Sequence, residues 1–449
     1  MSSGSRRKLL YISAHFPPSA ASGVFRTLGF LQGLTSRNWD ISVLALKEVK
    51  EERVDRKLLE RVPPQVSVKR TGYWDPFSLK SAVANIFRRK RVGETKSASG
   101  PAPMAEVKLC CDASPDSERT SWKDKISYIL KTPDSYIGWV PVAVFRSLIS
   151  LQRPELILST APPFSALLIG VLLKKVWRVP VVVDLRDPWV LNPFRALRPG
   201  PAGKLDRVFE RFVMAHADGI VLNTDEARKC YEKYYPQYAG KMITITNGFD
   251  ERFLSVSPLE TTPDDCLRVI HVGALYGARS PVALLGAIEC FPEITVELYG
   301  PGTEKYSDLA GSRVLLSPSI EHSAAIALQK GADVVLLIGN CVRESVQIPA
   351  KLFEALAIAR NIWLIDTADS PTRKLLRKEG IPHYFSLNEA TEIKATLEKI
   401  RQDWTAGMLS REVLPGNKIK KFSRVELSAM LDDFLLGFTE RGSGGGTRV

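Results

Sequence analysis

Short apolar runs alternate along most of the chain with longer segments in which apolar residues recur at helical spacing. The pattern predicts a first strand at 8–14 and a helix at 23–34, and a second alternation of the same kind starts at Leu267. Strands that alternate with helices at this spacing are typical of parallel βαβ units, so the pattern predicts an α/β fold with two Rossmann-like domains. The other predicted strands are 41–46, 155–159, 180–184, 219–222, 241–246, 294–299, 314–316, 333–338 and 361–365.

The predicted domain boundaries follow from the breaks in this pattern. Residues 1–257 form the N-terminal domain, and 258–266, with prolines and acidic residues, form the linker. The second domain is 267–420, a final amphipathic helix is 421–438, and 439–449 is a glycine-rich, disordered tail. At 449 residues the chain is too long for a single hydrophobic core, which agrees with two domains.

Residues 74–122 depart from this regular texture. The apolar residues of 74–87 are interleaved with lysine and precede a basic run of Arg88, Arg89, Lys90 and Arg91. Such a segment suits the anionic surface of a membrane, and a solvated helix end explains it nearly as well. Residues 93–121, rich in Ser, Pro, Gly and charge, are a predicted flexible insert.

The composition narrows the location and the partners. A net charge of +13 suits an anionic small molecule, an anionic membrane or nucleic acid, but no zinc-finger, RNP-like or helix-turn-helix signature supports nucleic acid. The six scattered cysteines predict reduced thiols rather than disulfides. No apolar run reaches membrane-spanning length, and the N-terminus does not read as a signal peptide. We therefore expect a cytoplasmic protein, either soluble or peripheral at the inner face of the membrane.

The segment 333–360 contains the strongest candidate site. Its apolar start predicts a buried strand, and the apolar spacing after Pro349 predicts a helix. The free N–H groups of such a helix point at the carboxyl end of the strand, where phosphates bind in α/β sheets. Lys351 is placed to reach a phosphate, and Glu354 to reach a pair of ribose hydroxyls. An ordinary amphipathic helix with solvated Lys and Glu is the alternative.

Two other strand-to-helix loops combine glycine with a cation. Gly23 and Arg26 lie at the start of the first predicted helix, and the strand that begins at 267 ends in Gly273, with Arg279 just before the next helix. Glycine lets the backbone approach a ligand closely, and a helix start attracts anions. A turn glycine and a surface arginine would also explain the first pair.

Polar residues follow two strands of the first predicted domain. His15 comes after the first strand and is either a polar contact at a cleft or a plain loop residue. Asp184, Arg186 and Asp187 follow the strand at 180–184, where a carboxylate within hydrogen-bond reach can orient or deprotonate an acceptor hydroxyl. The alternative is an internal Asp–Arg pair that fixes the loop.

The order of these motifs carries a family resemblance. Proline, a small residue, Lys, two apolar residues and Glu at 349–354 are similar to the donor-binding segment of family 4-type glycosyltransferases, which are retaining GT-B enzymes that use nucleotide sugars. The bacterial members that work on cell-surface polysaccharides look most similar. The other landmarks that fall in the family's order over nearly the whole chain are His15–Pro18, Ser159–Phe164, Asp184–Trp189, Asn247–Asp250 and His271–Arg279.

The resemblance implies an architecture and a reaction. The two domains would face each other across a cleft, and the final helix would cross back to the first domain. A hexose-type sugar would move, with retention and without metal or other cofactor, from a UDP- or GDP-linked donor to a hydroxyl of a saccharide or lipid-linked acceptor. The donor site would then comprise Gly23, Arg26, Gly273, Arg279, Pro349, Lys351 and Glu354; the acceptor side His15, Asp184, Arg186 and Asp187; and the catalytic groups Asp187, Arg279 and Lys351.

Two departures from the family's pattern keep other functions open. Ala274 stands where the family has a first cation, so one phosphate contact would be missing or come from Arg26 or Lys351. Val346 stands where many relatives have a glutamate that contacts the sugar, so that only Glu354 of the usual pair is present. The alternatives are a non-catalytic, nucleotide-binding assembly subunit and a nucleotide-sugar 2-epimerase. A dehydrogenase is disfavoured, because neither domain opens with G-x-G-x-x-G.

Overall fold

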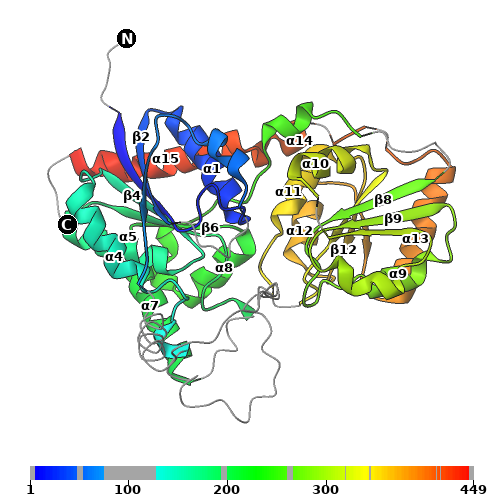
Figure 1. The fold of residues 1–449 in the computed structure, drawn as a ribbon, viewed down its shortest axis with the longest axis horizontal. Helices are drawn as coiled ribbons and strands as arrows, with labels where there is room; N and C mark the ends of the chain where they lie inside the picture. The colour runs from blue at the N-terminus through cyan, green and yellow to red at the C-terminus, as the bar shows by residue number, and fades with distance from the viewer. Residues whose placement is uncertain are drawn as a thin grey trace, which may run out of the picture. The chain divides into compact units, whose positions relative to one another are not determined.

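The protein is described from a computed structural model (Figure 1). The described residues are 6–47, 54–74, 128–193, 200–259, 266–318, 320–342, 345–410, 412–414 and 416–443. The predicted basic run Arg88, Arg89, Lys90 and Arg91, the predicted insert 93–121 and most of the predicted linker lie outside these residues.

The chain forms two compact units. The first comprises Met1–Val221, Tyr235–Ile243 and Phe434–Val449, and the second comprises Leu222–Tyr234 and Thr244–Asp433. The division therefore assigns part of the predicted N-terminal domain to the second unit. Hydrogen bonds from Thr224 Oγ1 to the Val346 carbonyl, at 2.7 Å, and from Lys378 Nζ to Asp225 Oδ2, at 2.9 Å, explain this assignment.

The first unit is built on a seven-stranded sheet in the order β3-β2-β1-β4-β5-β6-β7. Two of its central strands each begin with three residues of the Val, Ile and Leu type and have no exposed residue, as expected for strands covered by helices on both faces. The strands are β1 (Arg7–Ser13), β2 (Trp39–Leu46), β3 (Ser67–Thr71), β4 (Leu156–Ala161), β5 (Val181–Leu185), β6 (Gly219–Leu222) and β7 (Met242–Thr244). The helices are α1 (Gly23–Thr35), α4 (Trp139–Ser150), α5 (Ser165–Trp177) and α7 (Gly200–His216).

The second unit is built on a six-stranded parallel sheet in the order β10-β9-β8-β11-β12-β13. The strands are β8 (Leu267–Val272), β9 (Ile294–Tyr299), β10 (Val314–Ser317), β11 (Val334–Ile338), β12 (Ile362–Ile365) and β13 (Tyr384–Ser386). The helices are α8 (Asp225–Tyr234), α9 (Val282–Ile288), α10 (His322–Gly331), α11 (Ala350–Ile358), α12 (Pro371–Lys378), α13 (Ala390–Thr405), α14 (Gly416–Ile419) and the first half of α15 (Arg424–Ser443).

Each face of this second sheet has its own hydrophobic core. Along β11, Val335 and Leu337 pack with apolar residues of α10 and α11, whereas Val334 and Leu336 pack with those of α9 and α13. Figure 1 shows α10 and α11 on one side of the strands and α9 and α13 on the other. The period-two alternation of strand side chains thus explains why an unbroken apolar run is needed here. The predicted α/β fold with two Rossmann-like domains is confirmed.

Both sheets have the strand order in which the chain reverses direction next to its first strand. The reversal lies between β1 and β4 in the first unit and between β8 and β11 in the second. In open α/β sheets, ligands bind beyond the carboxyl ends of the strands at this point. The ends of β8 and β11 are therefore the place to look for the donor site.

The last helix differs from its prediction in where it begins and ends. The chain turns at Ser423, whose Oγ accepts a hydrogen bond from the Glu426 N–H at 3.2 Å, so α15 begins at Arg424 rather than at residue 421. The helix runs to Ser443, so residues 439–443, which we expected in a disordered tail, are helical. Its end belongs to the first unit, where Phe434 and Phe438 lie against Gly219.

Two short strands escaped the sequence analysis. β3 carries Lys69 and Arg70 and is largely exposed at an edge, so it has no apolar run to reveal it. β13 at the edge of the second sheet is only three residues long. Among the described helices, none combines the length and the apolar character needed to cross a bilayer.

Shortening Leu336 tests the assignment of the second core. Leu336 is fully buried, whereas Leu315 on β10 of the same sheet is 52% exposed. Leu336→Ala should lower the free energy of unfolding of this unit by about 2–5 kcal/mol, because it leaves a cavity. Leu315→Ala should change it by less than about 0.5 kcal/mol in the same urea titration. Equal effects of the two substitutions would contradict the packing described.

Candidate nucleotide-binding site

The second unit brings three predicted donor residues together at the carboxyl ends of β8 and β11. The ammonium of Lys351, on the first turn of α11, donates a hydrogen bond to the carbonyl of Val272, the last residue of β8. Burial lowers the pKa of Lys351 to about 8, the carboxylate of Glu354 opposes this shift, and the guanidinium of Arg279 adds to it. Arg279 and Glu354 therefore both lie within electrostatic reach of the Lys351 ammonium.

The start of α11 is arranged much as predicted. Pro349 is the N-cap residue rather than the first helical residue, and no described side chain caps the helix. The first N–H groups of an uncapped helix are donors without intrahelical partners, and they carry the positive end of the helix dipole. This helix start suits an anion close to Lys351.

Because Gly273 has no side chain, the side chains of His271 and Lys351 can lie close to the backbone at the end of β8. A Cβ atom on Gly273 would lie 2.5 Å from His271 Nε2 and 3.5 Å from Lys351 Nζ. Gly300 comes equally close, since its own Cβ would lie 2.3 Å from the Gly273 carbonyl oxygen at a φ of 137°. Side chains at these two positions would push apart the groups that line the end of the sheet.

Arg279 is held above this sheet end by its own loop. Its guanidinium lies 5.0 Å from the ring centroid of Tyr276, and its Nε is buried with no hydrogen-bond partner among the described residues. Burial raises the pKa of Asp366, and the charge of Arg279 partly offsets that rise. Arg279 therefore lies within electrostatic reach of Asp366, a carboxyl group that the sequence analysis did not single out.

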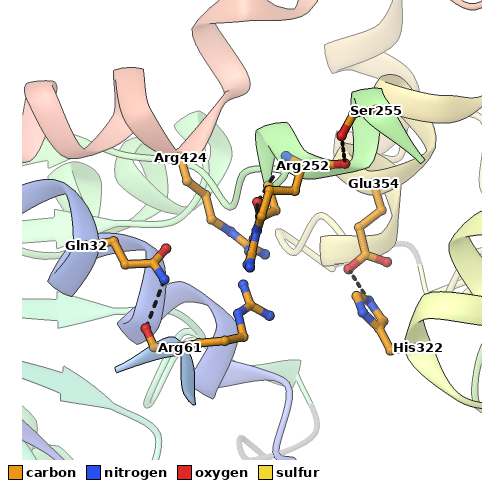
Figure 2. Close-up of polar contacts among 8 residues, drawn as sticks. Gln32, Arg61, Arg252, Ser255, His322, Glu354 and Arg424 are labelled. Carbon is orange, nitrogen blue, oxygen red and sulfur yellow. Dashed lines mark hydrogen bonds and ion pairs between the residues drawn. The ribbon is translucent and has the colours of Figure 1, made fainter. Parts of the chain in front are cut away.

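Glu354 is paired with His322, the first residue of α10. His322 Nε2 lies 3.3 Å from Glu354 Oε1, and Figure 2 shows the two side chains pointing toward one another. Burial alone would raise the pKa of Glu354. The hydrogen bond from His322 and the charges of Lys351 and Arg424 outweigh burial and hold that pKa below its usual value. An ionised carboxylate only accepts hydrogen bonds, so Nε2 is the donor.

A second charged cluster adjoins this pair in the same unit. Asp250 accepts hydrogen bonds from Arg252 Nε at 2.9 Å and Nη2 at 2.6 Å, and Arg424 Nη1 lies 3.4 Å from Asp250 Oδ2. Figure 2 shows both guanidinium groups turned toward the same place. Although burial opposes the shift, the two arginines lower the pKa of Asp250 to about 2. Phe253 of the same turn packs edge-on against His322, with ring centroids 5.5 Å apart.

In the first unit, Arg26 and Asp184 bind each other. Arg26 Nη2 donates to Asp184 Oδ1 at 2.8 Å, Thr160 Oγ1 donates to Asp184 Oδ2 at 2.8 Å, and both charged side chains are buried. Buried charges need such partners because desolvation is costly. Both side chains are therefore held by each other within the first unit. Their expected roles, Arg26 at a phosphate and Asp184 at an acceptor hydroxyl, stay predictions.

Gly23 and Arg186 form one contact. A Cβ on Gly23 would lie 1.0 Å from Arg186 Nη1, so the space that we expected to admit a ligand holds this guanidinium. Arg186 also donates to the carbonyls of Ala161, at 3.2 Å from Nε, and of Pro162. Burial lowers its pKa, and the charges of Asp184 and Asp187 oppose the shift.

The two remaining acceptor-side residues, His15 and Asp187, are both half-buried in the same unit. The His15 ring packs edge-on against Tyr136, with centroids 5.9 Å apart. Asp187 is half-buried and lies within electrostatic reach of Arg186. No group of three His, Cys, Asp or Glu side chains suited to a metal ion occurs among the described residues.

Sequence reasoning missed two histidines of the second unit, His271 and His322. His271 was quoted only as part of the 271–279 motif, and His322 only as part of a helix. Both lie next to residues that were predicted, His271 beside Gly273 and His322 beside Glu354. The signal available was their position, since each stands at the boundary of a strand or a helix whose neighbouring loop was already a candidate.

Comparison with known proteins agrees with the motifs. The model of the glycosyl transferase 4-like domain matches residues 26–248. Residues 26–248 belong to this family. The resemblance to family 4-type GT-B glycosyltransferases is thereby confirmed. No curated protein matched the chain in sequence.

Solved structures share the fold over nearly the whole chain. Sucrose-phosphate synthase from Thermosynechococcus elongatus has a TM-score of 0.65 at 13% identity, with 97% of this chain and 100% of that chain covered. HepE from Anabaena, in complex with UDP, has a TM-score of 0.60 at 14% identity, covering 96% and 100%. A putative UDP-N-acetylglucosamine 2-epimerase from Listeria monocytogenes has a TM-score of 0.56 at 7% identity, covering 97% of each. At these identities the likeness shows the fold alone.

The Arg26–Asp184 pair gives a stability prediction for the glycosyltransferase. Arg26→Met leaves a buried carboxylate without its cation and should lower the free energy of unfolding by about 3–5 kcal/mol. The double variant Arg26→Met, Asp184→Asn should recover most of that loss, because the amide still accepts from Thr160. Denaturant titration of both variants measures this. A double variant as unstable as the single one would show that the charge is not what requires Arg26.

The Asp250 cluster gives a pH prediction. The folded pKa of about 2 lies below the usual 3.8, so the cluster's contribution to stability is fully present above the unfolded pKa and is lost as the pH falls through about 2. The difference in unfolding free energy between the native protein and Asp250→Asn should therefore be larger at about pH 5 than at about pH 3. A difference that stays constant over this range would contradict the charge interaction.

Proposed function

We propose that this glycosyltransferase moves a hexose-type sugar from a UDP- or GDP-linked donor to a hydroxyl group, with retention at the anomeric carbon and without a metal ion. The acceptor is a saccharide or a lipid-linked precursor of a polysaccharide. The reaction takes place in the cytoplasm or at the inner face of the membrane. The family supports glycosyl transfer itself.

The observation that carries the proposal is the grouping of Arg279, Lys351 and Glu354 at the switch point of the second sheet. Two cations and an uncapped helix start lie together there. A diphosphate needs this combination of charge and N–H donors. Glu354 lies one turn into α11 as an ionised acceptor, and a ribose diol supplies the matching donors.

The difficult step of such a transfer is departure of the nucleoside diphosphate from the sugar. Negative charge grows on the leaving oxygen as the bond to the anomeric carbon breaks, while the sugar becomes oxocarbenium-like. Arg279 and Lys351, fixed in place and largely withdrawn from water, would stabilise that charge without reorganising. The departing phosphate can take the proton of the acceptor hydroxyl, and we assign to Asp187 the orientation of that hydroxyl.

A structural relative supports UDP as one of the two nucleotides to test. HepE from Anabaena has been solved with UDP and also with UDP and glucose, at a TM-score of 0.56 in the second case. In the family that this chain resembles, the loop after β10 contacts the base through backbone groups, so we expect its side chains not to select the base. Both nucleotides therefore belong in the first titration.

Val346 favours a second candidate function. The position where many relatives carry a sugar-contacting glutamate has an apolar side chain here, and the Val346 carbonyl is occupied by Thr224. Ala274 likewise lacks the first cation of the family pattern. A nucleotide-binding assembly subunit without transferase activity would need neither the sugar-contacting glutamate nor the first cation of the family pattern. It would bind UDP or GDP but release no free sugar and no altered sugar from any donor.

Removing the two best-placed side chains tests the nucleotide site. Glu354→Ala and Arg279→Ala should each weaken binding of UDP or GDP roughly 10-fold to 100-fold in calorimetric titration, because each removes a hydrogen bond to a charged group. Exposed residues provide matched controls, and Glu392→Ala and Arg207→Ala should leave the affinity unchanged. Unchanged affinity in both site variants would remove the assignment of this site.

A donor screen separates the candidate functions. A sugar nucleotide that binds the folded protein raises its melting temperature, and the shift grows with ligand concentration. A transferase should then hydrolyse the stabilising donor slowly and transfer its sugar when an acceptor is added. Conversion of UDP-N-acetylglucosamine to a 2-epimer without acceptor would instead identify an epimerase, and binding without any turnover would identify the assembly subunit.

A further inference from the structure

His271 is a buried side chain with one ring nitrogen in a hydrogen bond and the other without a partner among the described residues. It lies near the end of β8 and is 3% exposed, and its Nδ1 lies 2.9 Å from the carbonyl oxygen of Leu336 on β11. A carbonyl oxygen only accepts, so Nδ1 carries the proton and Nε2 presents a lone pair. Among the described residues, Nε2 has no hydrogen-bond partner.

A buried acceptor without a donor is uncommon in native proteins and calls for a physical explanation. Protonation of the ring does not supply one. Burial, together with the charges of Lys351 and Arg279, lowers the pKa of His271 to about 3, so the ring is neutral at any physiological pH. The lone pair is therefore available to accept a hydrogen bond from a nearby donor.

The ammonium of Lys351 lies near this lone pair and has N–H donors that the Val272 carbonyl does not take. Nε2 and Lys351 Nζ both flank the site where a Cβ of Gly273 would stand, at 2.5 and 3.5 Å. An ammonium group has three N–H donors, and the Val272 carbonyl takes one of them. The flexible end of the lysine side chain lets Nζ approach Nε2, since glycine leaves the space between them open.

We propose that His271 is a positioning residue for Lys351: with the Val272 carbonyl, its Nε2 lone pair holds the Lys351 ammonium over Gly273, so that the third N–H faces a phosphate oxygen of the nucleotide. The inference rests on the proposed function only for the identity of that anion. It assigns a purpose to the neutral tautomer, because a protonated His271 could not accept.

The arrangement has a consequence for the charge of Lys351. The neutral ring of His271 faces the ammonium from β8. Burial lowers the pKa of the ammonium to about 8; Glu354 from α11 opposes this shift and Arg279 from the loop after β8 adds to it. The cation is present below this pKa and is lost as the pH rises through it. An acceptor on Nε2 stabilises the ammonium over the amine, so its removal should make Lys351 lose its proton at a lower pH.

The variant His271→Asn separates the two ring nitrogens. The asparagine amide can still donate to the Leu336 carbonyl from near the position of Nδ1, but no atom replaces Nε2. Lys351→Met provides the background in which a residue that acts through the ammonium can no longer act. The double variant completes the cycle.

The first measurement is the affinity for UDP and for GDP across about pH 6–10, by calorimetry in all four proteins. We expect native binding to weaken above about pH 8, and His271→Asn to weaken binding about 10-fold at that pH and to move the onset to lower pH. In the Lys351→Met background, His271→Asn should have no further effect. Equal losses in both backgrounds would mean that His271 acts only through packing and would overturn the proposal.

The second measurement needs no nucleotide. The rate at which a small acetylating reagent modifies Lys351, followed by mass spectrometry against pH, reports the free amine and hence the titration of this one lysine. In His271→Asn the midpoint should fall by about half to one pH unit. An unchanged midpoint would overturn the inference, whereas absence of nucleotide binding in the native protein would overturn the proposed function and leave this titration standing.

Discussion

The contact between the Lys351 ammonium and the Val272 carbonyl is the interaction on which the candidate site depends. It joins the start of α11 to the end of β8, two segments that the chain brings together only through the switch in strand order. Withdrawal from water disfavours the charged form of Lys351, and this lowers its pKa to about 8. An anion on the uncapped helix start would relieve that cost, so the site is built for negative charge before any ligand arrives.

The two units handle buried charge in opposite ways. In the first, Arg26 and Asp184 neutralise each other, and Arg186 fills the space over Gly23, so the charges fix the loops that follow β1 and β5. In the second, Arg279 keeps a buried Nε without a partner among the described residues, and His271 keeps an idle lone pair. Buried polar groups whose hydrogen bonds are all made within the fold indicate a structural role. Buried polar groups without a partner at the end of a sheet favour a ligand-binding role.

The sequence alone was sufficient to predict features that depend on residues within one segment. The buried strands, the helix after Pro349 and the placement of Lys351 and Glu354 on its first turns follow from spacing within one segment. It was insufficient where a contact joins distant segments. Nothing near Asp184 shows that Arg26, 158 positions away, will bind it, and nothing near Glu354 shows His322. The break at Ser423 was missed because the apolar spacing continues through the turn, and only the capping hydrogen bond reveals the helix start.

The central claim is that one nucleoside diphosphate bridges the cations and the acid at the end of β8. A crystal structure of the protein with UDP tests it most directly. The account predicts the diphosphate at Gly273, with its oxygens within hydrogen-bond distance of Lys351 Nζ and the Arg279 guanidinium, and the ribose hydroxyls on Glu354. A nucleotide bound with its diphosphate away from Lys351, or a ribose that leaves Glu354 on His322 alone, would contradict it.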